Sequence, residues 1–188
     1  MANVFQIGID LGGTKIESLV LDPQGREVHR RRVASASQQG YAAMLAATLD
    51  TIREAVSHVP PGQAHTVGIG IPGSVNAATS LVQNANSTCL IGHPLQQDLE
   101  AALGRRIGLD NDANCFTLAE SRLGAGRGFD LVFGVIMGTG CGGGMALGGQ
   151  VRQGPNRIAG EWGHVSVDPA GIPCYCGNRG CVETLISG

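Results

Sequence analysis

The sequence predicts an α/β fold in which an opening strand–glycine turn–strand unit is begun a second time. Two observations lead to this prediction. A buried, β-branched run at residues 4–10 enters one glycine turn, and another apolar run at residues 131–137 enters a second glycine turn at residues 138–144. Between them, strands and helices alternate. We therefore expect two α/β halves whose glycine turns face one another across a cleft.

Each element follows from its local pattern. The first three strands, joined by short turns, predict an antiparallel meander at residues 4–10, 16–21 and 27–34. Apolar side chains then recur at helical spacing until a Pro-Pro-Gly stop, which predicts a helix over 40–59. The elements expected next are a strand at 66–71, an extended loop at 74–91, a helix at 94–103, a strand at 106–109, a helix at 113–123, the strand at 131–137, a hairpin partner at 145–151 and a loop-rich end.

Composition limits the functions that need to be considered. The chain has 188 residues, 43% of them hydrophobic and 15% charged, which is enough for one large domain or two small ones. A formal net charge of -2 gives no general attraction to nucleic acids or anionic membranes. No apolar run approaches the roughly 18 residues of a membrane span, and the first residues do not resemble a secretory signal. We expect a cytoplasmic protein with no nucleic-acid or membrane partner.

The first glycine turn lies in the segment IGIDLGGTKIE. Gly12 and Gly13 allow backbone N–H groups to approach phosphate oxygens, while Thr14 adds a hydroxyl and Lys15 a positive charge. Asp10, at the strand end, could hold the cation that accompanies a nucleotide. The segment is neither a Rossmann nor a Walker motif, because a strand follows it. An ordinary hairpin turn would explain the two glycines alone.

The second glycine turn, GTGCGGG, repeats this pattern after another buried strand. Its candidate phosphate-binding residues are Gly138, Thr139, Gly140 and Gly142. Two glycine turns after apolar strands favour a phosphate clamp over two structural turns.

The segment LDNDANC places carboxylates at the end of a strand and the start of a helix. Such a carboxylate could accept a proton from a bound hydroxyl during phosphoryl transfer. Asp112 could equally cap the helix that begins at Ala113. Spacing alone does not choose between Asp110 and Asp112.

The most specific motif is GEWGH followed by PCYCGNRGCVE. One imidazole and three thiolates form a closed tetrahedral set for structural Zn²⁺, supplied by His164, Cys174, Cys176 and Cys181. Free thiols or a Cys-x-Cys redox pair are the alternatives. Glu161 and Glu183 flank the cluster, where they could simply be surface carboxylates.

Together the motifs DLGGTK, GIPG, NDANC, GTGCGGG, GEWGH and CYCGNRGC resemble the ROK family of sugar kinases and sugar-responsive repressors. The resemblance covers essentially the whole chain. It implies an actin-like ATPase (ribonuclease H-like) fold with two lobes, at residues 1–115 and 116–188. It also implies ATP with Mg²⁺ between the glycine turns, a hexose at the interdomain wall and a structural zinc. Dimers are common in the family, so a homodimer remains open.

The resemblance also implies roles for individual residues. Asp112 matches the family's general base, which favours it over the capping role. The residues implied to contact sugar are Gly73, Asn86, Asn111, Glu161, His164 and Glu183. The segments NANST and PCYCGNRGCVETLISG look most like the fructokinase (manno-fructokinase) branch, whose kinases phosphorylate a hexose, here at a 6-hydroxyl. N-acetylglucosamine kinase is the next resemblance, and glucokinase is a further alternative.

The chain ends at Gly188, where members of the family continue into further helices. We therefore expect an incomplete C-terminal lobe. This leaves two functions of another class beside the kinase. One is a truncated, non-catalytic remnant that binds zinc and sugar, and the other is a sugar sensor without a catalytic step.

Overall fold

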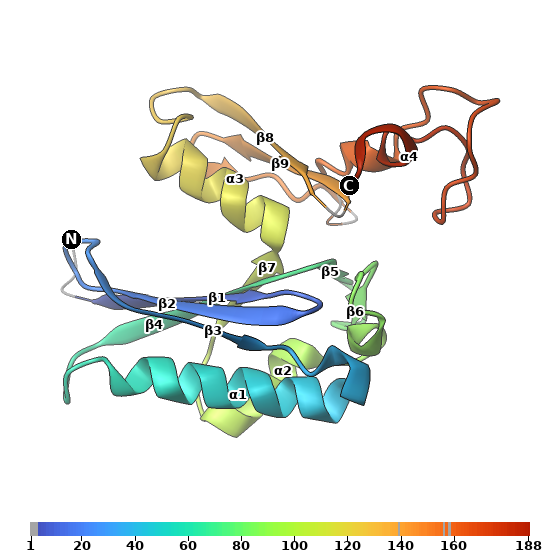
Figure 1. Cartoon of the computed structure of the whole chain (residues 1–188). Coiled ribbons are helices and arrows are strands. Elements are labelled where there is room, and N and C mark those ends of the chain that lie inside the picture. The colour runs from blue at the N-terminus through green and yellow to red at the C-terminus, as the bar shows by residue number, and fades with distance from the viewer. Residues whose placement is uncertain (1–3, 139, 156, 158) are drawn as a thin grey trace. The chain divides into compact units, whose positions relative to one another are not determined.

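A computed structural model describes residues 4–138, 140–155, 157 and 159–188 (Figure 1). The chain divides into two compact units, unit 1 (Met1–Asp112) and unit 2 (Ala113–Gly188). The sequence placed this boundary after Cys115, three residues further on. Each unit contains a β-sheet and helices, so the predicted α/β class is confirmed.

Unit 1 is built on a five-stranded mixed sheet with the order β3-β2-β1-β4-β7. Its strands are β1 (Phe5–Leu11), β2 (Lys15–Leu21), β3 (Glu27–Ala34), β4 (His65–Ile71) and β7 (Gly108–Asn111). The first three form the predicted antiparallel meander, and β4 and β7 run parallel to β1. The sheet thus brings together three parallel strand ends that lie far apart in the sequence.

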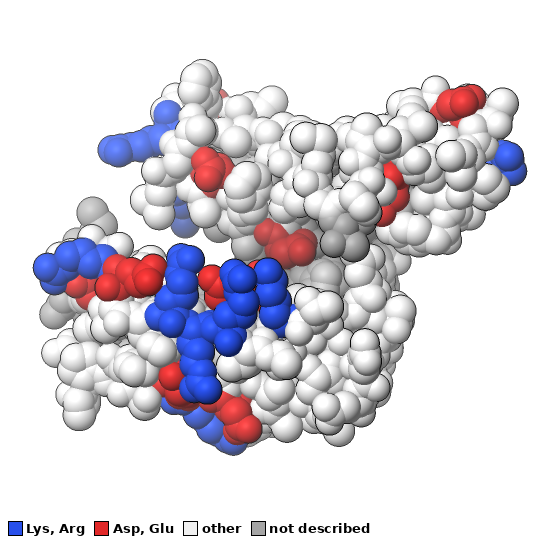
Figure 2. Space-filling model, in the orientation of Figure 1, with Lys and Arg blue, Asp and Glu red and all other residues white. Residues whose placement is uncertain are grey.

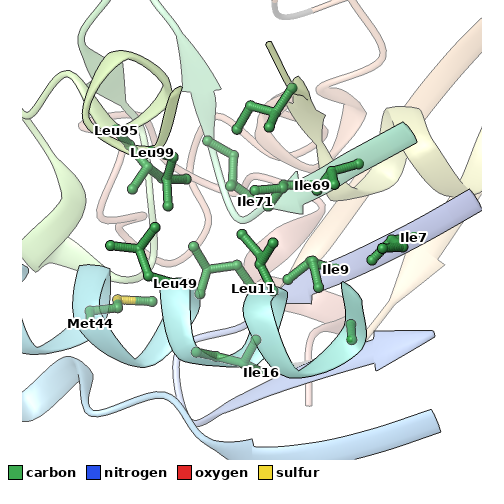
Figure 3. Close-up of a cluster of buried hydrophobic side chains, with 14 of the residues drawn as sticks. Ile7, Ile9, Leu11, Ile16, Met44, Leu49, Ile69, Ile71, Leu95 and Leu99 are labelled. Atoms are coloured by element: carbon green, nitrogen blue, oxygen red, sulfur yellow. The ribbon is translucent and has the colours of Figure 1, made fainter. Parts of the chain in front are cut away.

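The core of unit 1 lies between this sheet and two helices, α1 (Tyr41–Ser57) and α2 (Leu95–Leu103). Alternate residues of β1 are buried because successive side chains of a strand point to opposite faces. Figure 3 shows Ile7, Ile9 and Leu11 directed toward the same cluster as Leu49 and other helix residues. Burial of each such aliphatic side chain contributes about 1.5–3 kcal/mol, which fixes the sheet against the helices.

The segment expected as an extended loop at 74–91 is more ordered than the sequence predicted. It contains the short hairpin of β5 (Ser74–Val75) and β6 (Val82–Gln83), then a 3-10 turn, η2 (Thr88–Leu90). The Asn76 side chain accepts hydrogen bonds from two backbone N–H groups in the turn. Such a local side-chain turn has no apolar period, so a reading based on periodicity misses it.

Unit 2 contains a three-stranded antiparallel sheet, ordered β10-β9-β8. Its elements are α3 (Asp112–Leu123), β8 (Leu131–Met137), β9 (Cys141–Leu147), β10 (Gln150–Val151), η3 (Trp162–His164) and α4 (Glu183–Ile186). The hairpin partner of β8 begins at Cys141 and not at residue 145 as predicted. Gly142, Gly143 and Gly144, which the sequence assigned to the turn, are therefore strand residues, while Gly138 and Gly140 lie outside the strands. One face of β8 carries a row of exposed apolar side chains, which are Leu131, Phe133, Val135 and Met137.

Candidate functional site

Three candidate segments of unit 1 meet at one edge of the sheet. Asp10 of β1 lies opposite Gly70 of β4, and Gly70 lies opposite Asp110 of β7. Because these strands are parallel, the segments that follow them leave the sheet at the same edge. The first glycine turn follows β1, Pro72-Gly73 follows β4, and Asn111-Asp112 spans the end of β7 and the start of α3. The carboxyl edge of parallel strands is where α/β sheets bind ligands.

The first glycine turn is held by hydrogen bonds within unit 1. The Gly12 N–H donates to the Lys15 carbonyl over 2.9 Å, so this amide is used by the turn itself. The Gly13 carbonyl accepts a 2.7 Å hydrogen bond from the Ser35 hydroxyl and another from Ser37. Thr14 and Lys15 are exposed. Ser35 and Ser37, which no sequence motif singles out, hold a turn whose Thr and Lys side chains reach solvent.

Charged groups surround Asp10 on the same face of the sheet. Desolvation by neighbouring residues and the Glu17 carboxylate raise the pKa of Asp10, while Lys15 and Arg32 oppose this rise. The Arg32 guanidinium donates to Glu17 over 2.7 Å and lowers the pKa of Glu17. Figure 2 shows basic and acidic side chains interspersed on this unit, which fits local ion pairing better than a uniformly basic surface.

Asn111 and Gly73 connect two of the strand ends. The buried Asn111 side chain donates from Nδ2 to the Gly73 carbonyl over 3.0 Å. Gly73 has a φ of 123°, and a Cβ there would lie 2.7 Å from the Gln83 carbonyl oxygen, so glycine alone fits. Asp112 follows as the exposed first residue of α3, and Asn86 is exposed. The structure therefore brings Gly73, Asn111 and Asp112 to one edge.

The second glycine turn is closed by short-range and long-range hydrogen bonds. The Gly138 N–H donates to the Gly140 carbonyl over 3.0 Å, while Thr139 lies outside the described residues. Gly142 lies within β9, opposite Ile136, and its carbonyl accepts from the Trp162 indole N–H over 2.7 Å. Only Gly138 and Gly140 of the described candidates therefore lie in the turn itself.

The GEWGH segment packs against β9 backbone to backbone. A Cβ on Gly163 would lie 2.1 Å from the Cys141 carbonyl oxygen, and one on Gly160 would lie 2.6 Å from the Gly143 carbonyl oxygen. Side chains at these positions would separate the two segments. Close packing explains the glycines of this region. A run of three glycines in the sequence is equally consistent with phosphate binding, so the sequence alone does not separate the two roles.

The four predicted metal ligands converge. One donor atom from each of His164, Cys174, Cys176 and Cys181 lies within 4.8 Å of all the others. The Cys176 and Cys181 sulfurs are 3.6 Å apart, and the Cys174 sulfur is 3.7 Å from His164 Nδ1. Tetrahedral Zn²⁺ with Zn–S near 2.3 Å and Zn–N near 2.0–2.1 Å needs separations of about 3.8 and 3.6 Å. The donor set fits zinc in both chemistry and spacing.

The residues that flank this Cys/His cluster differ in burial. Glu161 is half-buried immediately before η3, and His164 Nε2 lies 3.2 Å from the Tyr175 hydroxyl. Glu183 is only 8% exposed, so it is not the surface carboxylate that was one alternative for it. Its carboxylate accepts a hydrogen bond from the N–H of Cys141, the first residue of β9 after the second glycine turn.

The chain matches the sequence model of the ROK family over residues 6–188. It belongs to the ROK family. An N-acetyl-D-glucosamine kinase of Yersinia pestis bv. Antiqua (strain Nepal516) is 40% identical over 191 residues, covering 96% of this chain and 73% of the relative. The corresponding kinase of Yersinia pseudotuberculosis serotype O:1b (strain IP 31758) is also 40% identical, and 62% of its length is covered.

Solved structures agree with this ROK assignment. A ROK hexokinase from Thermus thermophilus has a TM-score of 0.82 and 34% identity, covering 98% of this chain and 60% of the other. A ROK family glucokinase from Streptomyces griseus, in complex with glucose and AMPPNP, gives 0.79 and 36%, covering 97% and 57%. The expected actin-like ATPase fold is confirmed. The ROK chain spans about three fifths of the length of most of these relatives.

A second His/Glu cluster of this ROK chain lies in unit 1, apart from the strand ends. Glu54 Oε1 is 3.3 Å from His29 Nε2 and 3.4 Å from His58 Nε2. The two rings stack with centroids 3.8 Å apart and planes 10° apart. Imidazole binds a metal in its ring plane, so stacked rings do not direct both nitrogens at one ion. Arg31 also contacts Glu54, which makes this an ion-pair cluster.

In the part of the chain that the structure describes, every helix falls short of the length or apolar content that crossing a bilayer requires.

Proposed function

We propose that this ROK chain carries the machinery for ATP-dependent phosphorylation of a hexose, with N-acetylglucosamine as the first candidate substrate. The observation that carries the proposal is the single sheet edge at which Asp10, the first glycine turn, Gly73, Asn111 and Asp112 meet. N-acetylglucosamine comes first because the Yersinia relatives bear that kinase name, and glucose second because the Streptomyces griseus structure holds it. The fructokinase branch that the sequence suggested becomes the third candidate.

In this mechanism Asp112 acts as the general base. Its exposed carboxylate accepts the proton of the sugar hydroxyl as that oxygen attacks the γ-phosphorus of ATP and the bond to ADP breaks. Asn111 and Gly73 are tied to each other, so they offer rigid polar groups for other sugar hydroxyls. Asn86 is a further proposed sugar contact.

The phosphates are proposed to contact both glycine turns. In unit 1, Gly13, Thr14 and Lys15 supply amide, hydroxyl and ammonium donors, because the Gly12 amide is used within the turn. In unit 2, Gly138 and Gly140 form the turn, with Thr139 between them in the sequence. Mg²⁺ bound with ATP would neutralise phosphate charge, and the Asp10 carboxylate is suited to hold it through water.

The Cys/His cluster is proposed to hold a structural zinc. Four protein ligands leave no position for water, so the ion would fix the loop and take no part in the transfer. Glu161, His164 and Glu183 on this loop are the proposed sugar contacts from unit 2. With Nδ1 directed at Cys174, His164 would keep Nε2 for a hydroxyl.

Measurement of sugar-dependent ADP release tests the proposal. The zinc-loaded chain is incubated with ATP, Mg²⁺ and N-acetylglucosamine, glucose, fructose or mannose. Asp112→Asn should lower kcat about 10²–10⁴-fold without changing the circular dichroism spectrum or zinc content. Asp110→Asn is the matched control, since the sequence pattern did not separate the two carboxylates.

Two results would contradict this function. Equal turnover by wild type and Asp112→Asn would show that Asp112 is not the general base. Binding of a hexose in calorimetry, with neither ATP binding nor ADP release, would instead favour a non-catalytic sugar-binding chain.

A further inference from the structure

The carboxylate of Glu183 connects the segment of the Cys/His cluster with the second glycine turn. Glu183 is two residues after Cys181, and both residues are buried. Its Oε2 accepts a hydrogen bond from the Cys141 N–H over 2.6 Å, across 42 residues of sequence. Cys141 is the first residue of β9 and directly follows the turn. The contact therefore fixes the point at which the chain leaves the turn.

Neighbouring contacts hold the same turn from the same segment. The Gly188 N–H donates to the Gly138 carbonyl over 2.8 Å. A Cβ on Gly140 would lie 3.1 Å from the other Glu183 oxygen, Oε1, so the carboxylate lies directly against the turn. Gly163, which directly precedes His164 at the other end of the Cys/His cluster in sequence, packs on the Cys141 carbonyl. Both flanks of the Cys/His cluster thus contact the residue that ends the turn.

A buried carboxylate requires hydrogen-bond donors, because loss of hydration would otherwise disfavour its charge. A carboxylate oxygen that accepts a backbone N–H satisfies two buried polar groups at once, so truncating the side chain removes that hydrogen bond from both. Glu183 lies in the short segment that also carries Cys181, one of the four residues of the Cys/His cluster. The cluster and the carboxylate that contacts the turn thus belong to one segment of unit 2.

We propose that Glu183 is a positioning residue that sets the conformation of the second glycine turn through the Cys141 amide, and so connects order in the Cys/His cluster to phosphate binding. The phosphate part of this inference rests on the proposed kinase function. The positioning part concerns the fold of unit 2 alone and can be tested without turnover.

Amide hydrogen exchange resolved by NMR in the full 188-residue chain measures the contact directly. Glu183→Ala should speed exchange at Cys141 roughly 10- to 100-fold, because a buried hydrogen bond is lost. Exchange at Ala146, in the same strand but away from the turn, should stay within a few-fold of wild type. Glu183→Gln should keep most of the protection at Cys141, because its amide oxygen still accepts the N–H.

Thr184→Ala is the matched control. It removes a hydrogen bond from the Thr184 hydroxyl to the Cys181 carbonyl in the same short helix but does not touch the turn. Exchange at Cys141 should be unchanged. The proposal is overturned if Glu183→Ala leaves Cys141 as protected as in wild type, or speeds Cys141 and Ala146 equally.

Ligand and metal measurements separate this inference from the kinase proposal. ATP affinity in calorimetry should fall in Glu183→Ala and recover in Glu183→Gln, whereas a residue that only binds sugar would lose sugar affinity in both variants and leave ATP affinity unchanged. A chelator that removes zinc should speed exchange at Cys141 as Glu183→Ala does. Unchanged exchange there would disprove the connection to the cluster. If no variant or wild type binds ATP but Cys141 responds as expected, the kinase function fails and the positioning role stands.

Discussion

Neighbouring glycines of β9 are predicted to respond oppositely to alanine. At Gly143 a Cβ would lie 2.7 Å from Trp162 Cδ1 and 2.8 Å from the carbonyl oxygens of Gly134 and Gly160, well inside ordinary contact at 3.4 Å. Two of these three atoms belong to the backbone and cannot rotate away. Gly143→Ala should therefore cost about 1–3 kcal/mol of unfolding free energy by overpacking.

Gly142 is the matched control in the same strand. A Cβ there would meet only the Cβ of Ala113, at an ordinary 3.8 Å. Replacing a strand glycine by alanine removes backbone entropy from the unfolded chain, so Gly142→Ala should be neutral or stabilise by about 0.5–1 kcal/mol. The two variants should thus differ by about 1–4 kcal/mol in the stability of unit 2.

The assay uses the single tryptophan of the chain, Trp162, which contacts Gly142 and lies in unit 2. Its fluorescence during thermal or urea unfolding reports on this unit. For a unit of this size the melting temperatures of the two variants should differ by roughly 4 °C or more. Melting temperatures within about 2 °C of each other would refute the packing role assigned to Gly143.

Three further predictions concern acid, metal and a buried amide. Arg32 lowers the pKa of Glu17 below its ordinary 4.5. The stabilisation by ionised Glu17 is therefore present above pH 4.5 and is lost as the pH falls through the pKa of Glu17 in the folded protein. Glu17→Gln should reduce the fall in melting temperature that acid causes. Cys181→Ser should abolish the binding of one zinc per chain measured by metal analysis, while Cys115→Ser, outside the cluster, should retain it. Asn111→Leu should destabilise unit 1 by about 1–3 kcal/mol in urea unfolding followed by circular dichroism, because the Gly73 carbonyl loses a buried donor; unchanged stability would exclude that role.

Sequence patterns predicted the features of this structure that depend on residues close together in the chain. Alternating burial in β1 follows from Ile7, Ile9 and Leu11, and the spacing of the cysteines near His164 is enough to bring four ligands together. Contacts over long sequence separations could not be predicted. Glu183, for example, accepts a hydrogen bond from the Cys141 amide 42 residues earlier, and no local pattern predicts that contact.

The start of β9 was placed four residues late for a similar reason. Glycine is a poor strand former, so a run of three glycines favoured a turn. In the structure these glycines are strand residues, and Gly143 and Gly144 admit close approach of other chain segments. Glycine is required at these positions by tertiary contacts, and the local sequence does not predict such contacts.

Lys15 begins β2 at the first glycine turn with its side chain exposed, and it is the only lysine in the sequence. Amine-reactive acylating reagents therefore have one internal target, besides the N-terminal amine. Mass spectrometry of a single labelled peptide would therefore measure, without any engineered tag, whether ATP, the proposed ligand of this turn, protects Lys15 from the reagent.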